Sequence, residues 1–479
     1  MLAKVDAMNA MLLESPDQAA VLPHDLLARF DTNGPRYTSY PTADRFVDAF
    51  GPASYLRALR QRAAGATVGG RQPLSIYVHV PFCESVCYYC ACNKVVTRHH
   101  DRAAPYLDAL EREIDRHFEV FGGRERVSQL HFGGGTPTFL SDDELGRLIM
   151  ALRTAFRIAP DAEISIEVDP RTVTPQRLAV LAQMGFNRIS FGIQDFDPDV
   201  QRAVHRVQSF ESVAALLEAA RRLGLRSTNI DLIHGLPHQT PESFARTLAQ
   251  VSALRPDRIA LYAYAHLPQR FKAQRRIETG ALPTGRQRVD MLDAAIRTFC
   301  AAGYDYIGMD HFALHADTLS VARRQGRLHR NFQGYSTQPD CDLIGLGVSA
   351  ISRIGATYSQ NAKTLDEYYG ALANGQFPTV RGIALTRDDL LRRAVIMALM
   401  CQGRVVFESI ESAYLVDFAS CFEAEMAALA PLRALGLVEI DEQAIQVTPQ
   451  GWFLVRAIAM AFDRHLQSDA RRERFSRVI

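Results

Sequence analysis

The sequence predicts an α/β fold built from repeated strand–helix units and followed by a mainly helical C-terminal region. From about residue 72 to residue 308, seven short apolar runs alternate with amphipathic helical segments. This alternation is typical of a parallel sheet with right-handed crossovers. Six or seven units fit either an open doubly wound sheet or a full or partial (β/α) barrel. Both arrangements place functional side chains at the carboxyl ends of the strands.

The seven apolar runs give the predicted strands, and cap signals give the starts of the helices between them. The strands are predicted at residues 75–80, 129–132, 163–168, 188–191, 228–233, 258–262 and 304–307. A helix opened by Pro105 should bury one face, made of Leu107, Leu110, Ile114, Phe118 and Phe121. Further helices should begin at a capping box at 141–144 and at Thr–Pro pairs at 174–175 and 240–241.

The two ends of the chain depart from this alternation. Residues 34–42 read as an extended, turn-rich arm. Beyond about residue 380, a helix capped at 386–389, a hairpin of 437–440 with 445–447, and a helix from Thr448 resemble a winged-helix arrangement. We therefore predict three parts: an N-terminal arm or lid at 1–50, a barrel domain with its extension at 51–378, and a C-terminal helical domain at 379–479.

Composition excludes several classes of protein. The 479 residues include 54 basic and 53 acidic side chains, so the net charge of +1 favours neither nucleic acid nor a membrane surface as a partner. No apolar stretch approaches the roughly 18 residues that span a bilayer, and the first residues lack the pattern of a secretory signal. Four of the eight cysteines are scattered, unlike a disulfide framework. We expect a cytoplasmic protein, and nothing demands more than a monomer.

The other four cysteines lie within ten residues, directly after the first predicted strand. The spacing of Cys83, Cys87 and Cys90 suits three irons of a four-iron cluster. The fourth iron would then have an open position, as catalytic metal sites do. A zinc knuckle is the alternative, but zinc usually takes two separated pairs of ligands, and no second pair is found. Cys92 could close the cluster, although its single-residue spacing from Cys90 favours a non-ligand near the site.

Polar residues follow the other predicted strands. Gly133, Gly134 and Gly135 come after the second strand and allow close backbone approach to a ligand. Carboxylates or amides come after the next three strands, and a Tyr-Ala-His segment follows the sixth, as Glu167, Asp169, Gln194, Asp195, Asp231, Tyr264, Ala265 and His266. Any one of these could be an ordinary hydrogen-bonded loop residue. Together they should converge on one mouth of the predicted sheet.

These motifs resemble a known family. The segment Cys83-x3-Cys87-x-Tyr89-Cys90 matches the signature of the radical S-adenosylmethionine (radical SAM) superfamily, and the glycine-rich loop is similar to its methionine-binding motif. More narrowly, the chain resembles the oxygen-independent coproporphyrinogen III oxidase (dehydrogenase) family of bacterial haem synthesis. That similarity runs through residues 34–43, 92–94, 308–312 and 475–479.

The resemblance implies a fold, cofactors and site residues. The fold would be a partial or full radical SAM barrel. Cys83, Cys87 and Cys90 would hold one [4Fe-4S] cluster per chain. Tyr77, Tyr89, Glu167 and the backbone of Gly134 to Thr136 would bind a first S-adenosyl-L-methionine. A second molecule would lie against Gly135, Thr136, Gln194, Arg206, Asp231, Ala265 and Ile351. The alternative for Arg206 is that it forms an ordinary ion pair on the protein surface and binds no ligand. Further candidates near the site are Cys92, Met309, His311 and Gln333.

The implied reaction is oxidative decarboxylation of two propionates of coproporphyrinogen III to vinyl groups, giving protoporphyrinogen IX. A 5′-deoxyadenosyl radical would abstract hydrogen from each propionate. The partners would be that substrate, a flavodoxin- or ferredoxin-like electron donor and an electron acceptor. By residue type, Arg36, His311, His329 and Arg330 are candidates for holding the propionates. The N-terminal arm would serve as a lid that excludes water.

Two other functions compete with this one. A related haem chaperone would share the cysteine motif, but such chains lack the 34–43 arm and a cysteine at position 92, and they differ at 329–335. A nucleic-acid binder could use the winged-helix-like region, whose tail carries Arg464, Arg471, Arg472, Arg474 and Arg477. Acidic residues intersperse these arginines, and no wider basic face is evident. A solvated helix packed on the barrel is the favoured interpretation of that tail.

Overall fold

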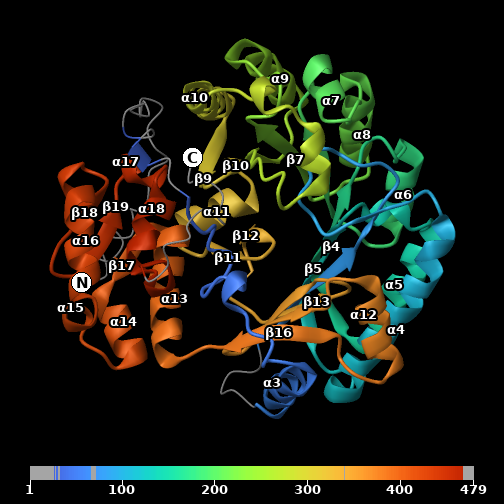
Figure 1. The fold of residues 1–479 in the computed structure, drawn as a ribbon, viewed down its shortest axis with the longest axis horizontal. Coiled ribbons are helices and arrows are strands. Elements are labelled where there is room, and N and C mark those ends of the chain that lie inside the picture. Colours follow the sequence, from blue (N-terminus) through green and yellow to red (C-terminus); the bar gives the residue numbers. More distant parts are fainter. Residues whose placement is uncertain (1–25, 27–28, 31–32, 66–71, 339, 468–479) are drawn as a thin grey trace.

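A large curved sheet organises the molecule. The computed structural model describes residues 26, 29–30, 33–65, 72–338 and 340–467. Twelve strands follow the order β16-β15-β14-β13-β1-β4-β5-β6-β7-β8-β10-β9. Helices line the outside of the curve, and the C-terminal helices form a separate group beside it (Figure 1). Within the described ranges no pairing joins β9 to β16, so the sheet is an open, partial barrel.

The parallel half of the sheet confirms the predicted strands. Its members are β1 (Leu74–Val80), β4 (Arg126–Gly134), β5 (Arg157–Val168), β6 (Arg188–Gln194), β7 (Ser227–His234) and β8 (Arg258–Ala263). The crossover helices are α4 (Ala103–Phe121), α5 (Asp142–Ala155), α6 (Pro175–Gln183), α7 (Pro198–Ala203), α8 (Phe210–Arg222) and α9 (Pro241–Leu254). The parallel register puts the carboxyl ends of all six strands at one edge.

The cap signals at 141–144, 174–175 and 240–241 are confirmed, but the helix predicted to open at Pro105 begins at Ala103, and one of its predicted core residues is exposed. Ser141 forms the predicted capping box with Glu144, and Thr174 and Thr240 cap α6 and α9. In α4, however, Phe118 is 42% exposed, so the prediction that it packs in the core is wrong. The buried stripe of α4 also includes Glu113 and His117, which shifts its centre and leaves Phe118 at the edge.

The strands at both edges of the sheet run in mixed directions. After α10 (Gly285–Ala301), the seventh predicted strand is β9 (Tyr304–Gly308), but β10 (His311–Leu314) lies between it and β8. At the other edge β13 (Leu343–Leu346) runs parallel to β1. It continues into the antiparallel strands β14 (Ile351–Ile354), β15 (Thr357–Asn361) and β16 (Thr379–Ala384). Helices α3 (Pro52–Ala64), α11 (Thr318–Arg324) and α12 (Leu365–Ala373) and the hairpin β11 (His329–Asn331) and β12 (Gly334–Ser336) complete this part.

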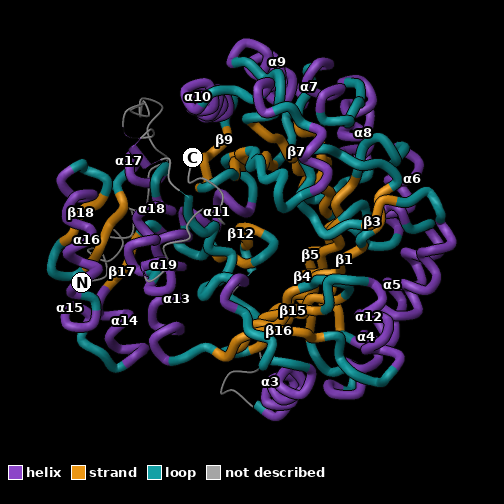
Figure 2. The backbone as a smooth tube through the Cα atoms, in the orientation of Figure 1, coloured by secondary structure: helices purple, strands orange, loops and turns teal. Residues whose placement is uncertain are grey.

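The C-terminal unit contains the predicted helix–hairpin–helix order (Figure 2). Its helices are α13 (Arg387–Gln402), α14 (Phe407–Tyr414), α15 (Phe418–Cys421) and α16 (Glu423–Ala434). Strands β17 (Arg404–Val406), β18 (Val438–Ile440) and β19 (Ala444–Val447) form one small sheet. The predicted helix from Thr448 is instead broken into α17 (Pro449–Trp452), α18 (Val455–Ala459) and α19 (Arg464–Gln467). Leu454 leaves helical geometry between the first two, with φ −111° and ψ 15°.

The arm joins the two units. Tyr37 on the arm donates a hydrogen bond from its hydroxyl to Asp463 Oδ2 at 3.0 Å. Val47 pairs with Gly382 of β16. Residues 1–25 of the predicted arm and the tail at 471–479 lie outside the described residues. The domain limits stay predictions, and because β16 belongs to the large sheet, we propose that the C-terminal unit begins with α13. No described helix is long and apolar enough to cross a bilayer.

Candidate active site

The cysteine loop is closed at its base by a small parallel pairing. Strand β2 (Phe82–Cys83) lies beside β3 (Val95–Val96), and Thr97 N–H donates to Cys83 O at 2.9 Å. The loop packs on the segment after α7, where Tyr88 N–H donates to Val204 O and the Tyr88 ring stacks on His205. The backbone that carries the cysteines is therefore held at both ends and in the middle.

The glycine-rich loop is fixed by close packing. A Cβ on Gly135 would lie 2.6 Å from Pro81 O, and one on Gly133 would lie 2.9 Å from the Glu167 carboxylate. Gly134 has φ +118° and a Cβ there would meet the His79 ring at 2.7 Å. Larger residues are thus excluded by β1 and β5 themselves. The close approach predicted toward a ligand is, in this structure, an approach to neighbouring strands.

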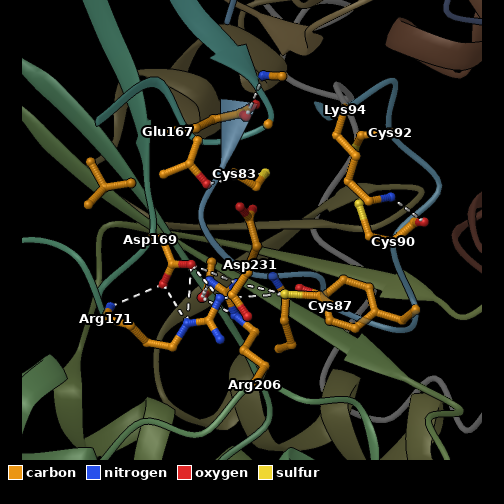
Figure 3. A pocket seen from close by; sticks show the side chains of 18 of the residues that line it. Cys83, Cys87, Cys90, Cys92, Lys94, Glu167, Asp169, Arg171, Arg206 and Asp231 are labelled. Atoms are coloured by element: carbon orange, nitrogen blue, oxygen red, sulfur yellow. Dashed lines mark hydrogen bonds and ion pairs between the residues drawn. The ribbon is translucent and has the colours of Figure 1, made fainter. Parts of the chain in front are cut away.

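A cavity of about 340 Å³ lies where the cysteine loop meets the strand ends (Figure 3). Most of the predicted site residues line it together: Cys83, Cys87, Tyr89, Cys90, Cys92, Gly134, Gly135, Thr136, Glu167, Gln194, Arg206 and Asp231. Lys94, Asp169, Arg171, Ser190 and Tyr262 also contribute to its wall. Residues from the cysteine loop and the ends of β4, β5, β6 and β7 therefore converge, as the strand-end argument predicts.

The cysteine thiols suit a negatively charged cluster. Cys83, Cys87 and Cys90 are free thiols on one cavity wall. Arg206 Nη1 lies 3.4 Å and Arg171 Nη2 3.6 Å from Cys87 Sγ. Thr136 Oγ1 lies 3.5 Å from Cys83 Sγ.

Cys90 and Cys92 are coupled to each other. A hydrogen bond from Cys92, helped by Lys94, lowers the pKa of Cys90 to about 6. The same hydrogen bond raises the pKa of Cys92 well above its ordinary value. Lys94 Nζ donates to Cys90 O at 2.9 Å, which holds the cation beside the loop. Of this pair, Cys90 is therefore the thiolate and Cys92 the donor.

Two of the three carboxylates that line the cavity, Glu167 and Asp231, have pKa values shifted in opposite directions. For Glu167, burial raises the pKa, but hydrogen bonds from His131 Nε2 and from Gly134 N–H at 3.1 Å outweigh it and lower the pKa overall. For Asp231, burial and the nearby Glu167 charge raise the pKa to about 6. Ser190 and Asn229 donate hydrogen bonds to its two oxygens. Glu167 is thus prepared as an anion, whereas Asp231 is costly to ionise.

Arg206 forms a buried ion pair. The alternative that it forms an ordinary ion pair on the protein surface is therefore wrong. The residue is 7% exposed, and its Nη1 lies 3.2 Å from Asp169 Oδ2. Its Nε donates to Gly192 O at 3.1 Å. Arg171 Nη2 meets the same Asp169 oxygen at 2.7 Å. One carboxylate therefore orients two guanidinium groups beside Cys87.

A smaller cavity of about 160 Å³ continues into the barrel interior. It shares Glu167, Ser190, Asp231 and Tyr262 with the larger one, and it reaches His311 and Gln333. Sequence reasoning missed His131, Arg171, Ser190 and Tyr262. A signal was present, because polar residues repeat at every second position along the strands, as at Asn229 and Asp231 in β7 or Glu163, Ser165 and Glu167 in β5.

Seven predicted residues line neither cavity: Tyr77, Asp195, Tyr264, Ala265, His266, Met309 and Ile351. The prediction that Asp195, Tyr264 and His266 converge on the site is wrong, because Asp195 is hydrogen bonded to Gln239 and Thr247 and Tyr264 is bonded to His266. Tyr77 stacks on His131, the histidine that contacts Glu167. Ala265 O accepts from Gln274 Nε2, which also donates to Tyr89 O at 2.8 Å. Ile351 begins β14 in the antiparallel extension. Tyr77 and Ala265 therefore do not line a cavity themselves, but each contacts a residue that binds to a cavity-lining residue.

The fold and the cysteine-loop cavity define a radical SAM protein. Residues 77–251 match the Radical SAM superfamily model, and residues 385–454 match the HemN C-terminal domain. The chain is 51% identical to an oxygen-independent coproporphyrinogen III oxidase of Escherichia coli, over 95% of this chain and 98% of the relative. It is 50% identical to one of Pseudomonas aeruginosa over the same shares. The chain belongs to the oxygen-independent coproporphyrinogen III oxidase family.

A solved structure agrees with this assignment. The coproporphyrinogen III oxidase (HemN) of E. coli superposes with a TM-score of 0.87 at 50% identity, covering 91% of this chain and all of that one. The nucleic-acid alternative for the C-terminal region and the haem-chaperone alternative receive no support from these relatives.

Proposed function

We propose that this chain converts two propionates of coproporphyrinogen III to vinyl groups, giving protoporphyrinogen IX, in oxygen-independent haem biosynthesis. The observation that carries this is the meeting of the cysteine loop, the glycine-rich loop and four strand ends on one 340 Å³ cavity. The family membership supplies the substrate, since relatives about half identical along the whole chain carry this activity in their names.

Cys83, Cys87 and Cys90 would hold the [4Fe-4S] cluster. Their spacing and shared cavity wall support this set, and Lys94, Arg171 and Arg206 provide cations that offset the negative charge of a thiolate-ligated cluster. When bound, the cluster and S-adenosyl-L-methionine supply the 5′-deoxyadenosyl radical that abstracts hydrogen from a propionate. Cys92, exposed beside Cys90, remains outside the ligand set.

The carboxylates and loop backbone would bind two molecules of S-adenosyl-L-methionine per chain, as the family resemblance implies. Glu167 is an anion suited to an ammonium or hydroxyl donor, and Tyr77 is connected to it through His131. Tyr89, Gln194, Arg206 and Asp231 line the same cavity, and the last three suit a second molecule. Asp169 and Gly192 already use part of the Arg206 guanidinium, so a ligand carboxylate would share it.

The remaining partners follow from the electron count. Generating the radical takes one electron, which a flavodoxin- or ferredoxin-like donor would supply. Losing CO2 and a hydrogen atom from the propionate leaves one electron for an acceptor. A cytoplasmic monomer is the proposed state, because the cluster needs a reducing compartment and the described cavities are complete within one chain.

An anaerobic turnover assay tests the proposal. Cluster-loaded protein with a low-potential reductant, S-adenosyl-L-methionine and coproporphyrinogen III should release two CO2 per protoporphyrinogen IX, together with 5′-deoxyadenosine. Cys421→Ser, which changes an exposed cysteine outside the cavity, is the matched control and should retain activity. Tight haem binding without formation of 5′-deoxyadenosine from this substrate would overturn the proposal in favour of the chaperone.

A further inference from the structure

An excess of positive charge lies where the arm meets the barrel interior. Arg36 on the arm forms an ion pair with Asp310, and its guanidinium lies 5.5 Å from the centre of the Tyr262 ring. Arg330 of β11 donates from Nε to Arg36 O at 3.3 Å. The two guanidinium groups thus share one neighbourhood, and Asp310 is the one carboxylate that ion-pairs with either of them among the described residues.

Arg330 is buried with part of its guanidinium unused. The residue is 4% exposed and packs 4.6 Å from the centre of the Tyr335 ring. Within the described residues its Nη1 has no hydrogen-bond partner. A buried cation without an anion is unfavourable unless a ligand completes it. The proximity of Arg330, after burial, also lowers the pKa of Arg36 to about 10.

Polar atoms in the wall of the adjoining cavity also lack hydrogen-bond partners among the described residues. His311 Nδ1 and both amide atoms of Gln333 are buried without partners in the part of the chain that the structure describes. Both residues line the 160 Å³ cavity, which shares Tyr262 and Asp231 with the larger cavity. Polar atoms left unpaired in a native interior commonly mark a place that a ligand or water completes. Arg330 itself lines neither cavity, but it packs on Tyr335, which lines the same smaller cavity as His311 and Gln333.

We propose that Arg36 and Arg330 together bind a propionate carboxylate of the porphyrinogen, with His311 and Gln333 contacting the polar edge of the same substrate. This rests on the function proposed above. A carboxylate matches the planar fork of a guanidinium and would supply the anion that Arg330 lacks. His329 is excluded, because neighbouring residues of a strand face opposite ways and its surroundings are Asp340, Arg353 and Arg393.

The arm would then act as the movable half of this carboxylate site. Arg456 of α18 donates from Nε to Pro35 O at 2.7 Å and from its Nη2 to Gly34 O. These bonds hold the backbone next to Arg36. Binding of the substrate carboxylate would therefore be coupled to docking of the arm on the C-terminal unit.

Binding of a non-reactive porphyrin tests the inference separately from turnover. The probes are coproporphyrin III, which keeps all four propionates, and its tetramethyl ester, which has no charge. Arg330→Gln should weaken binding of the acid roughly 10- to 100-fold, the range expected for a charge-assisted hydrogen bond. Binding of the ester, followed by fluorescence quenching, should not change. Arg36→Gln should show the same selectivity.

Controls separate a binding role from a structural one. Arg323→Gln removes another buried guanidinium that also has nitrogens without partners among the described residues, but this one belongs to α11 and packs 5.1 Å from the Trp452 ring centre, and it should affect neither probe. Arg330→Lys, which keeps the charge, should recover part of the affinity. Equal weakening of both probes by Arg330→Gln, or no weakening, would overturn the inference. Failure of the wild-type chain to bind coproporphyrin III would instead count against the proposed substrate.

Discussion

The two connected cavities differ in how their charged groups are satisfied. In the larger one, Glu167 is hydrogen bonded to Gly134 and His131, and Asp169 pairs with both Arg171 and Arg206. In the smaller one and beside it, atoms of His311, Arg330 and Gln333 lack partners among the described residues. The charged groups of the first cavity are already paired with protein groups, whereas the second, by the inference above, would be completed by the substrate. A preorganised site holds its geometry at no further cost when the reaction occurs.

The largest effect should come from the cysteines of the larger cavity. Cys83→Ser, Cys87→Ser or Cys90→Ser should each abolish the broad absorption near roughly 400 nm that thiolate-ligated clusters show, along with turnover. Cys92→Ser should retain the iron and sulfide content, since Cys92 is assigned outside the ligand set. Loss of the cluster in Cys92→Ser, measured by iron analysis after anaerobic purification, would show that four cysteines are required.

Removing one member of a buried ion pair in the larger cavity should have the next largest effect, which is a loss of fold stability. Asp169→Asn leaves Arg206 buried without its anion, so the free energy of unfolding should fall by about 3 kcal/mol, measured as a shift in urea midpoint. Asp161→Asn, at an 80% exposed partner of Arg126, should cost less than about 1 kcal/mol. Arg330→Gln removes a buried charge that has no ion-pair partner among the described residues, so despite the lost hydrogen bond to Arg36 O it should destabilise the fold less than Asp169→Asn does. A stable Asp169→Asn, or an equal loss of stability in Arg330→Gln, would erase the contrast between the cavities.

A smaller, pH-dependent effect is expected at Asp231, which both cavities share. Its pKa is raised from 3.8 to about 6, so between these pH values the folded state keeps a proton that the unfolded state has lost. Stability contributed by this group therefore falls as pH rises through that window, and the penalty is complete above pH 6. Asp231→Asn should be about 1–2 kcal/mol more stable than wild type at pH 7.5 and gain nothing at pH 4.

Glu167→Gln should change the stability of the fold in the opposite direction to Asp231→Asn. Because the pKa of Glu167 is lowered, its carboxylate stabilises the fold above the unfolded pKa and loses that contribution as pH falls. The Gln variant should therefore be less stable than wild type at pH 7.5. Thermal midpoints of both variants across pH 4 to 8 check the two signs. Equal behaviour of the two variants would contradict the assigned pKa directions.

Local signals in the sequence predicted the parallel half of the fold and most of the larger cavity. Capping boxes such as the one at Ser141 act within one turn of helix, so they can be read from a few neighbouring residues. Glu167 and Asp231 could be placed because the carboxyl ends of parallel strands share one edge. The cysteine spacing needs no tertiary information at all.

Features that depend on distant pairing were not predictable in this way. The short strands β13 to β16 carry no strong period, and their place in the sheet depends on pairing with β1. Strand β10 enters between β8 and β9 for the same reason. The group around Arg330 combines residues of the arm, β10 and β11, so residue type alone could not separate Arg330 from His329. The prediction for Phe118 was wrong because tertiary packing decides where the buried face of a helix ends, and Phe118 lies at that boundary.

The attachment of the arm also orders events during synthesis. Gly34, Pro35 and Tyr37 leave the ribosome early, but the groups that hold them, Arg456 and Asp463, are made near the end of the chain. Domains fold largely in the order of their synthesis. The cysteine loop and its cavity are therefore assembled while the arm still lacks its anchors. We therefore expect the arm to dock last, and the cavity to stay accessible for cofactor loading until translation is complete.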